Sequence, residues 1–246
     1  MDSIIAHRSF IAPEALTAML FTIPNPAASS DDALQALPKV RFWNRIARKY
    51  AADPIADEAG YERTLARTRD FLAPHHEVLE IGCGTGTTAL RLAPAVRWLH
   101  ATDVSAQMIA IARERQAASG QRGVEFRLAD ADGPLGAAER FDAVLAFNLL
   151  HLVSDLSATL QEVAAVLRPG GLLISKTPCI DEMSPLIGWV VPLAQALGKA
   201  PPVLRLDAPQ IQAALQRQGF DVLITERHAS AGRRDARPFI VARKVV

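Results

Sequence analysis

The stretch VLEIGCGTGTTALRLA, residues 78–93, constrains the fold more than any other part of the chain. It opens with apolar residues typical of a buried strand and closes with a pattern typical of a helix. Between the two, Gly82, Gly84 and Gly86 stand at every second position. Glycine adopts positive φ values at little cost, so this spacing predicts a tight turn from strand to helix. The first N–H groups of a helix lack partners within it, and the turn is therefore a candidate site for a small polar ligand.

The spacing of these glycines separates three kinds of nucleotide-binding turn. The dinucleotide pattern G-x-G-x-x-G would need a glycine at position 87, where the chain has Thr87. A phosphate-binding loop would need G-K-[ST], and no such sequence follows. The chain instead has an acid, Glu80, two residues before the first glycine. This acid-x-G-x-G-x-G pattern resembles the first motif of the class I S-adenosylmethionine-dependent methyltransferases.

Strands and helices alternate along the rest of the chain. Apolar runs that predict further strands lie at residues 96–101, 124–128, 141–147, 172–176, 220–225 and 238–244. Helical spacing of apolar residues precedes the first strand and separates most of the others, but no convincing helix joins the last two. The pattern predicts an α/β fold: a doubly wound, mostly parallel seven-stranded sheet, Rossmann-like, with an antiparallel last strand and N-terminal helices. The same arrangement is typical of the methyltransferase family.

The chain divides into an N-terminal arm and one domain. Residues 1–38 hold four prolines and a polar run, which favours a flexible or loosely docked arm; their apolar part is broken by Pro13, which argues against a signal peptide. Residues 39–246 are interpreted as the methyltransferase domain. Its apolar segment at 183–197 predicts a lid-like insertion, at about 180–205, over an apolar acceptor pocket. A packed helix pair or a dimer surface is the alternative.

Composition excludes several classes of function. The 246 residues have a formal net charge of +1, so no general attraction to nucleic acid is expected. No apolar run reaches the ~20 residues that span a bilayer. The two cysteines, Cys83 and Cys179, form no metal-ligand cluster and suit a reducing, cytoplasmic setting. Cys83 is interpreted as a small filler in the glycine turn. The basic run from Arg233 to Arg237, interrupted by Asp235, is interpreted as a solvated face.

The resemblance implies a site for S-adenosyl-L-methionine at the ends of the first strands. Glu80, Gly82 and Gly84 would shape the methionine end of the pocket. Asp103 lies 23 positions after Glu80, at the end of the second predicted strand, where a carboxylate can accept both ribose hydroxyls. Ser105 can cap the next helix, which would leave Asp103 free for the ligand.

The adenine end of the pocket is assigned in the same way. An acid after the third strand meets the adenine amine in the family; Asp130 holds that position here, with Ala131 after it to offer a backbone N–H. Asp132 is close enough to be the alternative, and Asp130 is preferred. Met108 either lies against the adenine or belongs to the core, and the core is the default interpretation.

Two further regions are candidates for contact with the reacting groups. Asn148 follows the fourth strand, near which the family places the sulfonium. His151 is a candidate general base, because its ordinary pKa lies near ~6.5, but a histidine between two leucines is more often structural. Tyr50, in the helical stretch FWNRIARKY, would close over the methyl donor or pack on the sheet.

The sequence therefore predicts an S-adenosylmethionine-dependent methyltransferase with a small, apolar or amphipathic acceptor, no metal and no nucleic-acid partner; it leaves the oligomeric state open. A non-catalytic sensor or partner subunit that binds the same cofactor is the first alternative. A nicotinamide-dependent oxidoreductase is the second. The short-chain form of that class uses Tyr-x-x-x-Lys, and neither Tyr50 nor Tyr61 is followed by a lysine at that distance.

Overall fold

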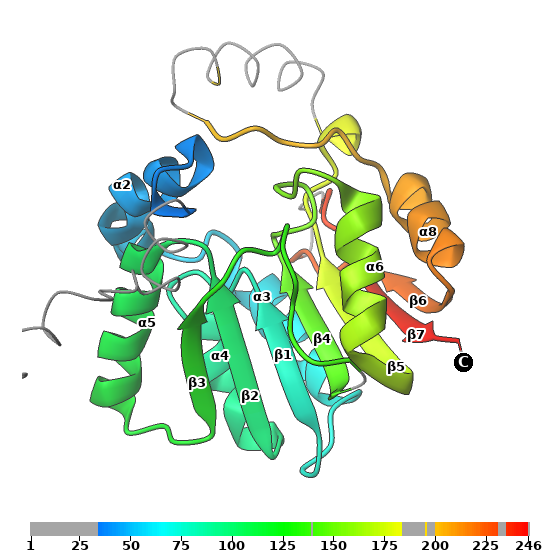
Figure 1. Cartoon of the computed structure of the whole chain (residues 1–246), viewed down its shortest axis with the longest axis horizontal. Helices are drawn as coiled ribbons and strands as arrows, with labels where there is room; N and C mark the ends of the chain where they lie inside the picture. The colour runs from blue at the N-terminus through cyan, green and yellow to red at the C-terminus, as the bar shows by residue number, and fades with distance from the viewer. Residues whose placement is uncertain (1–33, 139, 184–194, 196–199, 231–234, 246) are drawn as a thin grey trace, which may run out of the picture.

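A computed structural model describes residues 34–138, 140–183, 195, 200–230 and 235–245. Within these ranges, seven strands form one sheet in the order β3-β2-β1-β4-β5-β7-β6 (Figure 1). The strands are β1 Glu77–Ile81, β2 Trp98–Asp103, β3 Val124–Leu128, β4 Phe141–Phe147, β5 Leu167–Lys176, β6 Phe220–Glu226 and β7 Phe239–Lys244. Strands β1 to β5 pair in parallel, and β7 is antiparallel to both of its neighbours. The predicted fold class is confirmed.

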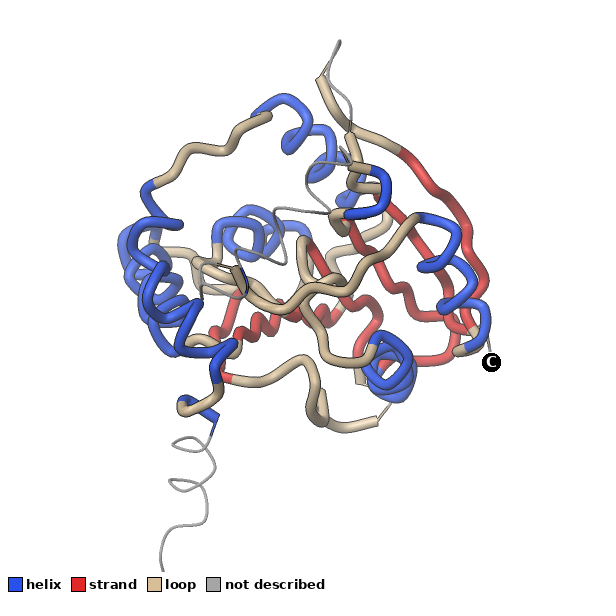
Figure 2. Tube along the Cα trace, turned by 90° about the horizontal axis from the view of Figure 1, so that it is seen from above, coloured by secondary structure: helices blue, strands red, loops and turns tan. Residues whose placement is uncertain are grey.

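Helices cover both faces of the sheet, as the view from above shows (Figure 2). They are α2 Pro38–Ala52, α3 Glu58–Arg69, α4 Thr87–Leu92, α5 Ala106–Ser119, α6 Leu156–Val166 and α8 Ala208–Arg217. One apolar core lies under α6 and α8 and includes Leu160 and Ile211. The other lies under α3, α4 and α5 and includes Leu65 and Leu92. All four of these side chains are fully buried, which accounts for the apolar spacing of their helices.

The carboxyl-terminal edge of the parallel strands is covered by two segments from distant parts of the chain. Helix α2 and the stretch that precedes α8 both lie over this edge (Figure 1). Residues 1–33 of the predicted arm lie outside the described residues, as do 184–194 and 196–199 of the predicted lid-like insertion. No helix in the described ranges is long and apolar enough to cross a membrane.

Strand β5 begins earlier than the sequence predicts. The apolar run places it at residues 172–176, but it starts at Leu167, directly after α6. Leu167 pairs with Phe141, and Leu172 is already opposite Ala143, so the register shifts between the two pairs. The residues Arg168 to Gly171 form this irregularity, because a proline and a glycine at positive φ cannot continue either a helix or a regular ladder.

The glycine turn has the predicted backbone. Gly82, Gly84 and Gly86 have φ values of 67°, 55° and 77°, which side chains rarely adopt. A Cβ on Gly86 would lie 2.8 Å from the Cβ of Ala112 and from the ring of Phe126. Both neighbours belong to the buried core, so neither has room to move. Gly86 is therefore required both for its conformation and for its lack of a side chain.

Replacing Gly86 with alanine is expected to lower the free energy of unfolding by about 2–4 kcal/mol, because strain at positive φ adds to overpacking of the core. Gly120 is the matched control, since it has a φ of 66° but a Cβ at this position would meet no atom within 4 Å. Its alanine variant should lose only about 1 kcal/mol. Denaturant unfolding measures both values, and equal losses would exclude the packing contribution.

Candidate functional site

Two neighbouring cavities lie at the carboxyl ends of the parallel strands. The smaller, here the Asp103 cavity, has a volume of about 160 Å³ and is bounded by the glycine turn, the end of β2 and the loop after β3. The larger, here the Lys176 cavity, has a volume of about 360 Å³ and extends from α4 to the end of β5. Tyr50, Phe147 and Asn148 line both cavities, so the two meet at these residues.

The Asp103 cavity brings together most of the residues that the sequence singles out. Apart from Glu80, every predicted cofactor-binding residue lines it: Gly82, Gly84, Asp103, Met108, Asp130, Ala131, Asn148 and Tyr50. Met108 is also 2% exposed and packs with Ala47 and Ile111, as the core interpretation requires, and its contact with the adenine stays a prediction. Residues from positions 50 to 148 thus converge on one small space.

Asp103 forms more hydrogen bonds with the protein than the sequence predicts. Its Oδ2 accepts the N–H of Gly84 and its Oδ1 accepts the N–H of Ser105, each at 2.9 Å. Ser105 does cap α5, through the N–H of Met108, as predicted, and the availability of Asp103 to a ligand stays a prediction. Burial raises the pKa of Asp103, against the opposing effect of the two N–H groups. Each carboxylate oxygen keeps a further lone pair for a ligand.

The two acids after β3 differ in their partners. Asp132 accepts the N–H and the hydroxyl of Ser154, at 2.8 and 2.7 Å, and forms an ion pair with Lys39 at 2.5 Å. Asp130 accepts Lys39, at 2.7 Å, and the N–H of Asp132. Asp132 is therefore committed to holding its own loop, which favours Asp130 as the residue available to a ligand. Lys39 was not singled out in the sequence, where no motif marks it.

Glu80 and His151 line neither of the two cavities. Glu80 is 2% exposed, and its Oε2 has no hydrogen-bond partner among the described residues. Burial, and then the charge of Asp103, raises the pKa of Glu80 to about 8. Burial lowers the pKa of His151 to about 4, so its ring is neutral at pH 7. His151 lines neither cavity, and its role as a general base stays a prediction.

Charged residues border the Lys176 cavity, and the sequence patterns do not identify them as site residues. Lys176 is the last residue of β5, and its ammonium contacts the hydroxyl of Thr64 at 3.0 Å and Asp235 at 3.1 Å. The side chain of Asp235 is only 1% exposed, so the predicted solvated face does not include this residue; Arg233 and Arg234 lie outside the described residues. Arg237 contacts the same carboxylate and lines the cavity. The position of Lys176 at a strand end was the available signal, because ligands bind at the carboxyl ends of parallel strands.

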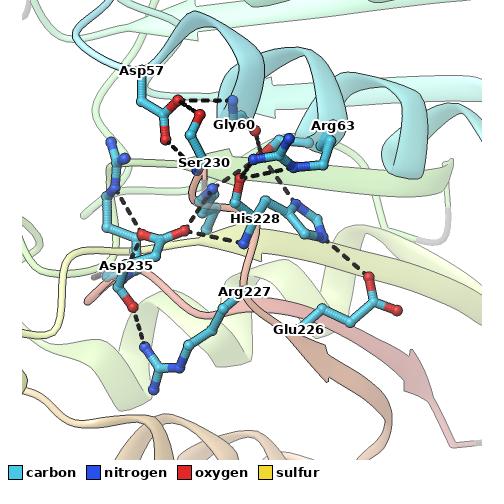
Figure 3. A network of polar contacts seen from close by, with 12 residues as sticks. Asp57, Gly60, Arg63, Glu226, Arg227, His228, Ser230 and Asp235 are labelled. Carbon is cyan, nitrogen blue, oxygen red and sulfur yellow. Dashed lines mark hydrogen bonds and ion pairs between the residues drawn. The ribbon is translucent and has the colours of Figure 1, made fainter. Parts of the chain in front are cut away.

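A polar network fastens the loop after β6 to the start of α3 (Figure 3). Asp57 accepts the N–H of Gly60 at 3.0 Å and the N–H of Ser230 at 2.9 Å. Arg63 donates twice to the carbonyl of His228, at 3.2 and 2.8 Å. The N–H of His228 in turn donates to Asp235. Segments far apart in the sequence therefore hold the Asp235 carboxylate in place beside the cavity.

Comparison with known proteins agrees with this geometry. Residues 78–171 match the family model described as a methyltransferase domain. The chain is 30% identical over 205 residues to the O-methyltransferase cnsE of Penicillium expansum, covering 79% of this chain and 69% of that protein. It is 36% identical over 137 residues to the demethylmenaquinone methyltransferase of Mycobacterium marinum, covering 54% of this chain and 56% of the relative.

Two further matches are to a much longer protein and to a solved structure. Against the highly reducing polyketide synthase 40 of Fusarium mangiferae the identity is 32% over 161 residues, yet the chain spans only 6% of that protein and covers 62% of its own length. A solved S-adenosylmethionine-dependent methyltransferase from Mesorhizobium loti superposes with a TM-score of 0.62 at 22% identity, over 75% of this chain and 98% of the other. That likeness shows the fold.

The glycine turn, the strand-end acids and the match to cnsE identify one family. The chain belongs to the class I S-adenosylmethionine-dependent methyltransferases, whose methyl donor is S-adenosyl-L-methionine.

Proposed function

We propose that this protein transfers a methyl group from S-adenosyl-L-methionine to a small amphipathic acceptor. One observation carries the proposal: the Asp103 cavity, with polar groups suited to a nucleoside, meets a larger cavity at Tyr50, Phe147 and Asn148. A donor in the first cavity and an acceptor in the second would face each other at that junction. Each cavity would then hold one of the two reactants.

The described residues fit the donor. A Cβ on Gly84 would meet no atom closer than Cε1 of Tyr50, at 4.0 Å, so bare backbone faces the open space. Asp103 can accept the two ribose hydroxyls. Asp130 can accept the adenine amine, and the N–H of Ala131 can donate to a ring nitrogen. Positively charged sulfur makes the donor's methyl group reactive, and the chain's part is to hold the reactants and exclude water.

The junction of the cavities has a strained backbone. Among the described residues, Asn148 is the one non-glycine residue with positive φ, at 53°. Its N–H donates to the carbonyl of Lys176 at 2.7 Å, which fixes the start of the loop after β4. Strain of this kind is often retained where a side chain must be aimed at a ligand. This supports Asn148 as a residue that orients the reactants, and a base is needed only if the acceptor must lose a proton.

The names of relatives support a small acceptor. One is a demethylmenaquinone methyltransferase, and another, from Methylocella silvestris and 31% identical over 153 residues, is a ubiquinone biosynthesis O-methyltransferase. Both names refer to quinones, which combine a polar ring with an apolar tail. An acceptor of this general kind would suit a cavity with both apolar and hydroxyl-bearing walls, such as Leu65, Thr64 and Thr88.

Titration calorimetry tests the cofactor assignment. We expect S-adenosylhomocysteine, the demethylated product, to bind saturably in the micromolar range, and NADH not to bind. The physical reason is that the glycine spacing and the strand-end acid suit a nucleoside without a pyrophosphate. Binding of NADH alone, or of neither compound, would contradict the proposal. Turnover against a panel of acceptors then separates an enzyme from a protein that only binds the cofactor.

A further inference from the structure

We propose that Lys176 and Arg237 bind a carboxylate of the methyl acceptor, so that the acceptor is a small amphipathic acid. This deepens the function proposed above and rests on it. The two side chains come from different segments, the end of β5 and the loop before β7, and both line the Lys176 cavity.

Lys176 has a donor to spare in a buried position. Its side chain is 9% exposed, and its ammonium has two contacts, Thr64 and Asp235. A lysine ammonium has three N–H donors, so one of them lacks an acceptor among the described residues. Burial lowers the pKa of Lys176, and the nearby charge of Asp235 opposes that effect. An anion in the cavity would satisfy the remaining donor and compensate the buried charge.

Arg237 adds a second cation beside the same carboxylate. Its Nε contacts Oδ1 of Asp235 at 3.3 Å, and its backbone N–H donates to the same atom at 3.0 Å. The terminal nitrogens of its guanidinium have no partner among the described residues, and the side chain is 41% exposed. Two parallel N–H groups of this kind match the two oxygens of a carboxylate. One carboxylate, Asp235, is thus shared between two cations that both border the cavity.

The other acid near these cations is already engaged. Asp57 lines the cavity and contributes to the electrostatic field at Lys176. Its two oxygens accept the N–H groups of Gly60 and Ser230 and the hydroxyl of Ser230. Asp57 therefore holds the loop after β6 in place, and the free N–H groups of Lys176 and Arg237 stay available to a ligand.

The position of Lys176 assigns it to the acceptor and not to the donor. In the sheet, Lys176 is paired with Phe147 of β4, whereas the glycine turn follows β1 on the opposite side of β4. Two strand spacings separate the ends of β1 and β5, which is roughly 10 Å. The junction of the cavities, at Phe147 and Asn148, lies between them. In an in-line methyl transfer the acceptor approaches the methyl carbon from the side opposite the donor's sulfur. Lys176 lies on that side of the junction.

The carboxylate between the two cations is held rigidly. Arg227 donates to the carbonyl of Asp235 at 2.5 Å, and the N–H of His228 donates to its Oδ2 at 3.2 Å (Figure 3). Because Asp235 is fixed, it fixes Lys176 and Arg237 as well. A rigid pair of cations loses less conformational entropy when it binds an anion than two mobile side chains would.

The test compares carboxylic acids with their methyl esters. The probes are hydroxybenzoic, cinnamic, 3-oxoacyl and medium-chain hydroxy acids, each as free acid and as ester, titrated into protein saturated with S-adenosylhomocysteine. We expect acids to bind and their esters to bind roughly 10- to 100-fold more weakly, as for loss of hydrogen bonds to a charged group. Lys176→Met and Arg237→Gln should each remove this preference and leave the affinity for S-adenosylhomocysteine unchanged.

Arg168→Gln is the matched control. Its side chain is 42% exposed and contacts one carboxylate, Asp142, but it lies at the opposite end of β5. It should keep the preference for acids. Lys176→Met leaves the Asp235 carboxylate buried without its lysine, which could unfold the protein. The double variant Lys176→Met/Asp235→Asn removes both charges, so it tests the loss of the lysine in a folded protein.

Three results would overturn the proposal: esters that bind as tightly as acids, no acid in the panel that binds, or a Lys176 variant with weakened affinity for S-adenosylhomocysteine. The last would place the lysine at the donor. Failure of wild-type protein to bind S-adenosylhomocysteine would instead overturn the proposed function, and it is measured before any acid is added.

Discussion

Replacing Asp103 with alanine is expected to weaken the binding of S-adenosylhomocysteine roughly 100-fold. Asp103 lies at the end of β2 and lines the smaller cavity, where its carboxylate can accept two ribose hydroxyls. Hydrogen bonds to a charged group contribute about 1.5–3 kcal/mol each, and about 1.4 kcal/mol corresponds to a tenfold change in affinity. Two such bonds therefore account for an effect of this size. Titration calorimetry of the variant against wild type measures it.

The same substitution has a structural cost that must be separated from the loss of binding. It leaves the N–H groups of Gly84 and Ser105 without their acceptor, at about 1–3 kcal/mol each if they stay buried. Ser105→Ala is the control, since Ser105 caps α5 in the same loop, is fully buried and lines neither cavity. It should lower stability by about 1 kcal/mol and leave affinity unchanged. A folded Asp103→Ala protein with wild-type affinity would remove Asp103 from the site.

Asp103 shows which parts of the site were predictable from the sequence. The glycine turn and the strand-end acid depend on local patterns, namely an apolar run, a required φ and a fixed spacing, so the sequence alone predicts both. The fold was predictable for the same reason: a strand such as β4, with Ala143 to Ala146 fully buried, is visible as an unbroken apolar run.

The cations of the site were not predictable in this way, because their meaning depends on distant partners. Lys39 pairs with Asp130, 91 residues away, and Lys176 contacts Thr64, 112 residues away. The run of arginines around Asp235 predicts a solvated face. The burial of Asp235 is decided instead by Lys176, at the end of β5, and no one-dimensional pattern contains that pairing. Only the tertiary fold brings these charges together.

The second large effect concerns Glu80, two residues before the glycine turn. Its carboxyl has a pKa raised from 4.5 to about 8, mainly by burial and to a lesser extent by the charge of Asp103. In the folded protein the carboxyl thus keeps its proton up to about pH 8, whereas in the unfolded chain it loses the proton near pH 4.5. Between these values the folded state binds more protons, so the free energy of unfolding falls as pH rises. The contribution is complete below pH 4.5 and is lost as the pH passes 8.

Glu80→Gln should therefore remove this pH dependence. Each pKa unit corresponds to about 1.4 kcal/mol, so the window represents roughly 4–5 kcal/mol at most. We expect similar stability for the two proteins at pH 5 and a more stable variant at pH 8.5, by roughly 3 kcal/mol or more. Urea unfolding at both pH values measures the difference, in which titration of groups that do not interact with Glu80 cancels. Parallel curves would mean that Glu80 is ionised in the folded protein. Because the charge of Asp103 contributes to the shift, Asp103→Ala should lower the pKa of Glu80 in the folded protein and reduce the loss of stability between pH 5 and pH 8.5.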